Sequence, residues 1–79
     1  MEIRVLFFGA TAAAVGTHEV TAGVGDAPSL IDLINQLVSK YPQLKSHKLL
    51  FAVNQEYAAE NTVLNAGDDV AIFTAVSGG

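Results

Sequence analysis

The sequence predicts a small α+β domain in which one amphipathic helix packs on one face of a mixed sheet of four to five strands. Three observations lead to this fold class. Residues 1–8 alternate in β-favouring side chains, residues 30–41 carry a helical apolar stripe, and two short apolar runs occupy residues 49–53 and 70–74. A chain of 79 residues has room for one domain, and with no cysteine it forms no disulfide and no thiolate metal site.

The first strand is predicted at residues 1–8. Ile3, Val5 and Phe7 share one face, while the opposite face becomes apolar at Leu6 and Phe8. Residues 9–16 are small, with a glycine at each end, so we expect a loose hairpin connection there. A second strand is predicted after it, at residues 17–21.

A helix is predicted to begin at Leu30. Ser29 stands in the N-cap position with Asp32 three residues later, which is a carboxylate variant of the capping box. Pro42 ends the helix because it disfavours helical geometry at Tyr41. So short a helix is not stable alone, and its apolar stripe needs a sheet to pack on.

The second half of the chain predicts two buried strands, at residues 49–53 and 70–74. Asn54-Gln55-Glu56 signals a hairpin into a short strand at Tyr57-Ala58, and residues 64–68 form a turn into the last strand. The resulting ββαββ order suggests a β-grasp. We place the β-grasp domain at residues 1–74 and a flexible C-terminal tail at residues 75–79.

The charge pattern excludes several classes of partner. The net charge is −4, and the cations are Arg4, Lys40, Lys45 and Lys48, which is a poor footprint for nucleic acid. No apolar run approaches the ~18 residues of a membrane span. We therefore expect no nucleic-acid or membrane partner and a cytoplasmic location.

The side chains do not assemble a conventional active site. His18 and His47 lie far apart in sequence and are expected at the surface, so we expect no metal. Asp68 and Asp69 are adjacent in a turn, where aspartate commonly stabilises the turn itself. A general acid and base pair is the less favoured interpretation, because neighbouring strand residues point to opposite faces.

The C-terminal residues Val76, Ser77, Gly78 and Gly79 are the most informative feature. A Gly-Gly end has no side chains and can thread its carboxylate into a channel too narrow for other residues. A carboxylate delivered in this way can be activated as an acyl-adenylate. Because the chain has no cysteine, any sulfur that it carries has to sit on that carboxylate, as a thiocarboxylate. The alternative interpretation is an ordinary frayed terminus.

Three aromatic residues predict a protein interface. If Ile3, Val5 and Phe7 pack under the helix, Phe8 and Phe73 emerge on the opposite face of the sheet, where Tyr57 of the short strand joins them. An exposed apolar patch on a small acidic domain usually marks an interface. The alternative is that these aromatics are merely tolerated at the surface.

These features together resemble the small subunits of molybdopterin synthases. Those subunits lie within the β-grasp sulfur-carrier family, which includes the thiamine-pathway carrier and is similar in fold to ubiquitin. The resemblance covers nearly the whole chain, and its segments are Val5-Leu6-Phe7-Phe8, Leu49-Leu50-Phe51-Ala52-Val53-Asn54-Gln55 and Gly67-Asp68-Asp69-Val70-Ala71-Ile72-Phe73 running into Val76-Ser77-Gly78-Gly79.

The resemblance implies a function in molybdenum cofactor biosynthesis. A ubiquitin-activating-like adenylyltransferase would use ATP to adenylate the Gly79 carboxylate, and a sulfur donor system would convert it to a thiocarboxylate. The tail would then enter the large synthase subunit, which supplies the catalytic side chains for the molybdopterin dithiolene. The chain itself would be a non-catalytic sulfur-donating subunit of a heterotetramer, with no bound cofactor.

Three alternatives stay open at the level of the sequence. The chain can be the sulfur carrier of another pathway, such as thiamine synthesis. It can be a ubiquitin-like modifier, whose tail is joined to a lysine amine after the same activation chemistry. It can also be an inert β-grasp interaction module, in which case deleting Gly78-Gly79 changes nothing.

Overall fold

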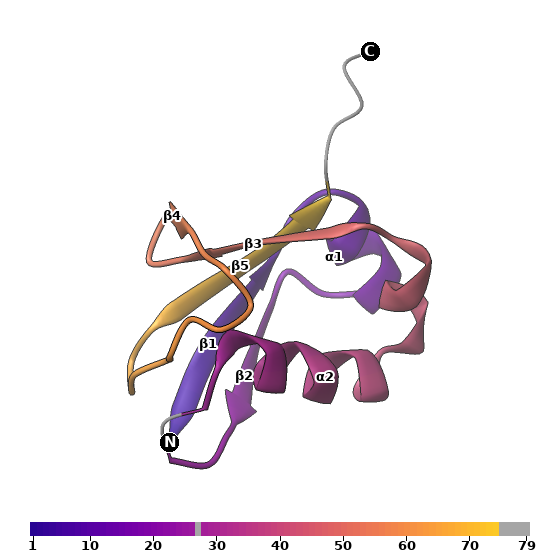
Figure 1. Ribbon diagram of the computed structural model, residues 1–79. Coiled ribbons are helices and arrows are strands. Elements are labelled where there is room, and N and C mark those ends of the chain that lie inside the picture. Colours follow the sequence, from indigo (N-terminus) through magenta and orange to yellow (C-terminus); the bar gives the residue numbers. More distant parts are fainter. Residues whose placement is uncertain (27, 75–79) are drawn as a thin grey trace.

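The computed structural model describes residues 1–26 and 28–74, so the predicted tail at residues 75–79 lies outside the described residues. Figure 1 shows the long helix lying across one face of a sheet. In chain order the elements are β1 (Glu2–Phe7), α1 (Ala10–Val15), β2 (Glu19–Gly23), α2 (Leu30–Lys40), the 3₁₀ helix η1 (Pro42–Ser46), β3 (Leu49–Val53), β4 (Glu56–Tyr57) and β5 (Asp69–Thr74).

The sheet is mixed and has five strands, as the sequence predicts. Its strand order is β2-β1-β5-β3-β4. β1 pairs with β2 in antiparallel and with β5 in parallel orientation, and β3 pairs antiparallel with both β5 and β4. The first and last strands of the chain therefore lie side by side at the centre of the sheet (Figure 1). Because they are parallel, β5 ends at the same edge of the sheet as β1, with Phe7 opposite Ile72.

The core lies between the sheet and α2, and the predicted assignment of faces is confirmed. The inward residues of the central strands and the buried face of α2 supply most of the core: Ile3, Val5, Phe7, Val70 and Ile72 from the sheet, and Leu30, Leu33, Ile34 and Leu37 from the helix. Each of these side chains is at most 6% exposed, and burial of a large aliphatic or aromatic side chain stabilises a fold by about 1.5–3 kcal/mol.

The predicted start and end of α2 are confirmed. One carboxylate oxygen of Asp32 accepts hydrogen bonds from the Ser29 backbone N–H and the Ser29 hydroxyl, both at 2.9 Å. These bonds, the backbone one first, hold the pKa of Asp32 below its ordinary value. At the other end, Tyr41 donates its N–H to the Leu37 carbonyl at 2.7 Å, and Pro42 begins η1.

The antiparallel pairing of β1 with β2 confirms the predicted hairpin, but its connection is not loose, because Ala10–Val15 form the helix α1. Ala is the strongest helix former, and the segment ATAAAV stands between two glycines with positive φ. Gly16 has φ 88° and donates its N–H to the Ala12 carbonyl at 2.8 Å, a left-handed helix end that favours glycine. β2 consequently begins at Glu19, two residues later than expected.

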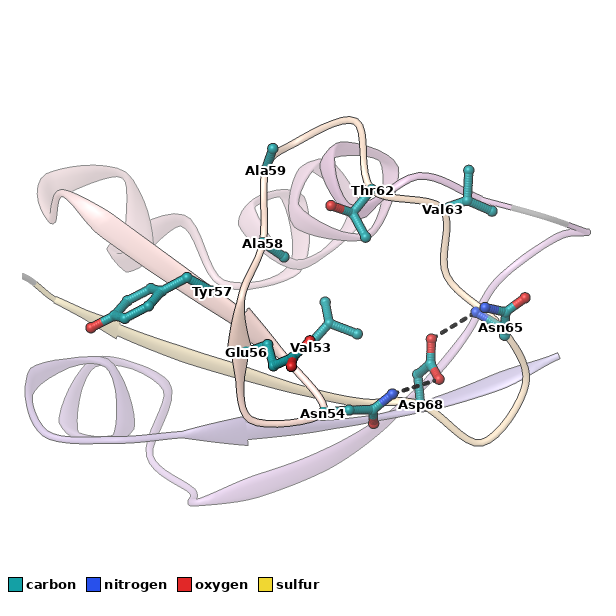
Figure 2. A pocket seen from close by; sticks show the side chains of 10 residues that line it. All are labelled: Val53, Asn54, Glu56, Tyr57, Ala58, Ala59, Thr62, Val63, Asn65 and Asp68. Carbon is teal, nitrogen blue, oxygen red and sulfur yellow. Dashed lines mark hydrogen bonds between the residues drawn. The ribbon is translucent and has the colours of Figure 1, made fainter.

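The predicted hairpin and turn in the second half are confirmed, although the short strand β4 begins one residue earlier than expected, at Glu56. Asn54 and Gln55 have φ values of 50° and 72°, so they form a two-residue turn of the kind that suits the twist of a hairpin. Figure 2 shows Asp68 between Asn54 and Asn65. Its carboxylate accepts from the Asn54 side-chain amide at 3.0 Å and from the Asn65 backbone N–H at 2.8 Å. Asp68 therefore stabilises the turn, as its position in the sequence suggests.

Candidate partner interface and tail exit

β5 ends at Thr74, the last described residue before the predicted tail. Its end is fixed by Thr11 of α1, whose side chain is fully buried. The Thr11 hydroxyl oxygen lies 2.7 Å from the Phe8 carbonyl oxygen and 2.9 Å from the Ile72 carbonyl oxygen, and it accepts the Phe8 N–H at 3.1 Å. One hydroxyl thus ties together the end of β1, the start of α1 and the end of β5.

The remaining predicted tail residues are not part of this geometry. Val76, Ser77, Gly78 and Gly79, the last of them predicted to carry the reacting carboxylate, lie outside the described residues. What the structure does establish is where β5 ends. Thr74 is opposite Leu49, the first residue of β3, and the end of β5 contacts α1.

The three predicted interface aromatics lie on the face of the sheet that points away from α2. Tyr57 is 81% exposed and Phe8 is 51% exposed, while Phe73 is partly buried. The rings of Tyr57 and Phe73 contact each other, with centroids 5.9 Å apart and an interplanar angle of 59°. Phe7 is paired with Ile72, and Phe8 and Phe73 are the next residues of the two strands. Continuing the parallel register by one residue therefore places Phe8 beside Phe73.

Small and medium apolar residues fill the space between these aromatics on the same face. The strand registers place Leu6 beside Ala71, Ala71 opposite Ala52 and Ala52 opposite Tyr57. Leu50 is opposite Phe73 on the same face. We call this region, made of Leu6, Phe8, Leu50, Ala52, Tyr57, Ala71 and Phe73, the apolar half of the outer face. Its role as an interface stays a prediction.

The other half of the outer face is polar. Arg4 of β1 and Asp69 of β5 form a two-bond ion pair, with the Arg4 Nε and Nη2 atoms 3.0 and 2.8 Å from the two carboxylate oxygens. This hydrogen bonding lowers the pKa of Asp69 and raises that of Arg4. The Asp69 carboxylate is therefore engaged by Arg4 and not by its neighbour Asp68.

One cavity of about 310 Å³ lies between the β3–β4 hairpin and residues 58–68 (Figure 2). The Tyr57 ring extends away from the other side chains drawn there, and Val63, 57% exposed, stands on the opposite side. Within residues 1–26 and 28–74, no three His, Asp or Glu side chains gather as a metal site. In the same part of the chain, no helix is long and apolar enough to cross a membrane.

Two features of this region have no clear signal in the sequence. Thr11 sits in a run of small residues that resembles a loop, and its burial follows only from α1 packing against η1 and β5. The pairing of Arg4 with Asp69 joins residues from opposite ends of the chain. His18 is exposed, as expected, and His47 is partly buried.

The order of strands, the single long helix on one face and the buried inner face define a ubiquitin-like β-grasp domain. SAMP1 of Haloferax volcanii, a small archaeal modifier protein, has this fold with a TM-score of 0.89, 27% identity and coverage of 100% of both chains. One chain in the complex of subunits 1 and 2 of the Helicobacter pylori molybdopterin-converting factor has the same fold. It matches this chain with a TM-score of 0.72 at 22% identity, over 100% of both chains.

The chain belongs to the ThiS family, whose model matches residues 5–79. Several of its relatives are molybdopterin synthase sulfur carrier subunits. The protein of that name from Chlamydomonas reinhardtii is 37% identical over 100% of both chains. The one from Mycobacterium tuberculosis is 38% identical, over 100% of this chain and 99% of its own length.

Proposed function

We propose that this chain is the sulfur carrier subunit of a molybdopterin synthase. The observation that carries the proposal is its similarity, at 37% and 38% identity along the whole chain, to two relatives from an alga and a bacterium that bear this name. Several polar side chains of the described residues have structural partners, in the cap of α2, the turn before β5 and one ion pair.

The proposed chemistry takes place at the carboxylate of Gly79. A carboxylate oxygen attacks the α-phosphorus of ATP on an activating adenylyltransferase, and pyrophosphate leaves. A sulfide-level nucleophile from a sulfur donor system then attacks the acyl carbon, and AMP leaves with the oxygen, so that a thiocarboxylate remains. In the synthase, the thiocarboxylate sulfur forms a bond to a carbon of the pyranopterin precursor while a carbon–oxygen bond at that carbon breaks and the oxygen leaves. Water then cleaves the acyl–sulfur bond to restore the carboxylate, and a second loaded carrier repeats the step at the neighbouring carbon, because a dithiolene holds two sulfur atoms. The sulfur enters molybdopterin, as part of molybdenum cofactor biosynthesis.

The apolar half of the outer face is the proposed contact with the large synthase subunit. It lies at the edge of the sheet where β5 ends, so a partner bound there is also placed to receive the tail. The Helicobacter pylori protein of this fold is itself found in complex with a second subunit. A heterotetramer and a cytoplasmic location remain predictions from the sequence.

The intact mass of the chain tests the loading step. The chain is incubated with ATP, a sulfur donor and the adenylyltransferase of its own host. We expect one sulfur atom to replace one oxygen, and the change to be absent when Gly79 is deleted. An unchanged mass, with an adenylyltransferase shown in parallel to activate another sulfur carrier of the same host, would contradict sulfur carriage.

A modifier is the second candidate function, because SAMP1 shares the whole fold at 27% identity. A modifier forms an isopeptide bond through its C-terminal carboxyl, whereas a carrier is recovered as a free chain with sulfur on its end. Digestion of host proteins after expression of the tagged chain separates the two. Because the chain has no Lys or Arg after Lys48, the digestion uses chymotrypsin, which cleaves after Phe73, and lysines bearing residues 74–79 would favour the modifier.

A further inference from the structure

The unpaired positive side chains of this chain are separated from most of its negative side chains. Of the four cations, Arg4 is paired with Asp69, and the other three fall within residues 40–48. No Asp or Glu occurs anywhere between residues 33 and 55. A chain of net charge −4 therefore keeps its unpaired cations in one segment.

One of these cations, Lys48, stands where β5 ends, and Lys45 precedes it by three residues in the chain. Lys45 lies in the last turn of η1, and Lys48 immediately precedes β3, whose first residue is opposite Thr74. Both lysines are exposed, and neither forms an ion pair within residues 1–26 and 28–74. The neighbouring helix α1, which packs against η1, bears no charged residue. We call this region, defined by Lys45 and Lys48, the tail-exit end.

The acidic residues lie elsewhere. Asp68 and Asp69 are at the other end of β5 from Thr74, and five residue steps of a strand span about 17 Å. That is about twice the screening length at physiological ionic strength. Glu56 is paired with Val53, at the far end of β3, and Glu2 begins β1, which runs parallel to β5.

The remaining acids do not neutralise the lysines either. Glu19 is the acid on β2 nearest to this edge of the sheet, but it is three strands away from β3 and its charge acts on Arg4. Asp32 is bound to Ser29 at the start of α2, and the Glu60 backbone is bound to Ile31 in the same first turn. Asp26 follows the end of β2 at Gly23, which is opposite Glu2 at the far end of the sheet. The tail-exit end is therefore positive on a molecule whose total charge is negative.

We infer that the tail-exit end docks an acidic protein surface, namely the rim of the channel in the activating adenylyltransferase that receives the tail. This inference rests on the proposed function. A tail of five residues reaches at most about 17 Å when fully extended, so the rim of any channel that takes in Gly79 has to approach Lys45 and Lys48. The apolar half of the outer face does not contain either lysine. The charge pattern thus defines a second contact that orients the carrier with its tail towards the channel.

Loss of the two lysine charges should change the association rate constant more than the dissociation rate constant. Complementary charges at the rim of an interface steer the encounter, raise the association rate and make it depend on salt. Without the lysines, a carrier of greater negative charge would approach an acidic rim against repulsion. Removal of both positive charges should lower the association rate about tenfold at low salt, with a small change in the dissociation rate.

The test compares two double variants that change the net charge by the same amount. Lys45→Gln with Lys48→Gln removes two positive charges at the tail-exit end. Gln55→Glu with Asn61→Asp adds two negative charges on exposed positions near the far end. Association with the purified adenylyltransferase is followed by stopped-flow mixing at several salt concentrations.

We expect the lysine variant alone to associate slowly and to lose most of its salt dependence. Equal slowing by both variants would show that only net charge acts, and no slowing by either would show that the lysines face no acidic surface. Each of these results would overturn the inference. The mass assay on the same variants measures sulfur loading independently. If the chain is loaded with sulfur but gives either of these two kinetic results, the proposed function stands and the inference about the two lysines is wrong.

Discussion

Replacement of Tyr57 by alanine should weaken binding of the large synthase subunit while leaving the domain folded. The Tyr57 side chain is 81% exposed, so about 160 Å² of an aromatic surface of about 200 Å² remains available for burial by a partner. At about 25 cal/mol per Å² this is worth up to about 4 kcal/mol. Ordering of the ring and desolvation of its hydroxyl reduce this, and we expect a loss of about 2 kcal/mol, or about thirtyfold in Kd.

The effect on stability should be much smaller. Within the described residues, the aromatic contact that Tyr57 makes is with the Phe73 ring, and such pairs are worth about 0.5–1.5 kcal/mol. Calorimetric titration with the purified large subunit measures binding, and urea denaturation measures folding. Tyr57→Phe should bind almost as the natural chain does. Val63→Ala is the matched control, because Val63 is also exposed but lies outside the apolar half. An unchanged Kd for Tyr57→Ala would refute the interface, and loss of folding would refute the assignment of faces.

Two further predictions concern the fold that presents this interface. Thr11→Val keeps the shape of the side chain but removes the hydroxyl that ties Phe8 to Ile72, so it should lower the free energy of unfolding by about 1–3 kcal/mol in urea denaturation; a variant as stable as the natural chain would show that the hydroxyl does not hold the end of β5. The carboxyls of Asp32 and Asp69 have pKa values lowered in the folded state, so their contribution to stability is present above the unfolded pKa of about 3.9 and is lost as the pH falls through the folded values. Asp32→Asn with Asp69→Asn should therefore flatten the acid side of the curve of unfolding free energy against pH, and a curve as steep as that of the natural chain would contradict this origin.

The sequence predicts most of the fold because its main elements have strong local signals. α2 has a continuous apolar stripe, which predicts a helix. The capping pair Ser29 and Asp32 marks where the helix begins, and Pro42 marks where it ends. The alternation in β1 and β5 fixes which residues face the helix, and therefore which aromatics face away from it. Local pattern and tertiary packing agree in these elements.

α1 was not predictable in the same way. A helix of six residues has no room for a hydrophobic period, and its small residues resemble a loop. Its stability comes from burial of Thr11 and Ala12 against distant parts of the chain, which a local pattern does not reveal. The glycines on both sides, at Gly9 and Gly16, were the available signal, because helices often end in a left-handed glycine.

The candidate site was predictable in its residues but not in its contacts. Phe8, Tyr57 and Phe73 follow from strand alternation, whereas the contact of Tyr57 with Phe73 depends on the register across β3. The Arg4–Asp69 pair depends on the parallel pairing of the first and last strands. The separation of cations from acids along the sheet likewise needs the topology, because adjacent strands bring together segments far apart in sequence.

The most direct test of the account follows the sulfur atom out of the loaded carrier. The chain is prepared with a thiocarboxylate at Gly79, mixed with the large synthase subunit and the pyranopterin precursor, and its intact mass is followed in a single turnover. We expect the chain to return to the mass of the free carboxylate, with two chains restored for each dithiolene formed and the dithiolene appearing only after the second transfer. A thiocarboxylate that persists while the complex is fully formed would contradict the role of this chain as the sulfur donor for molybdopterin.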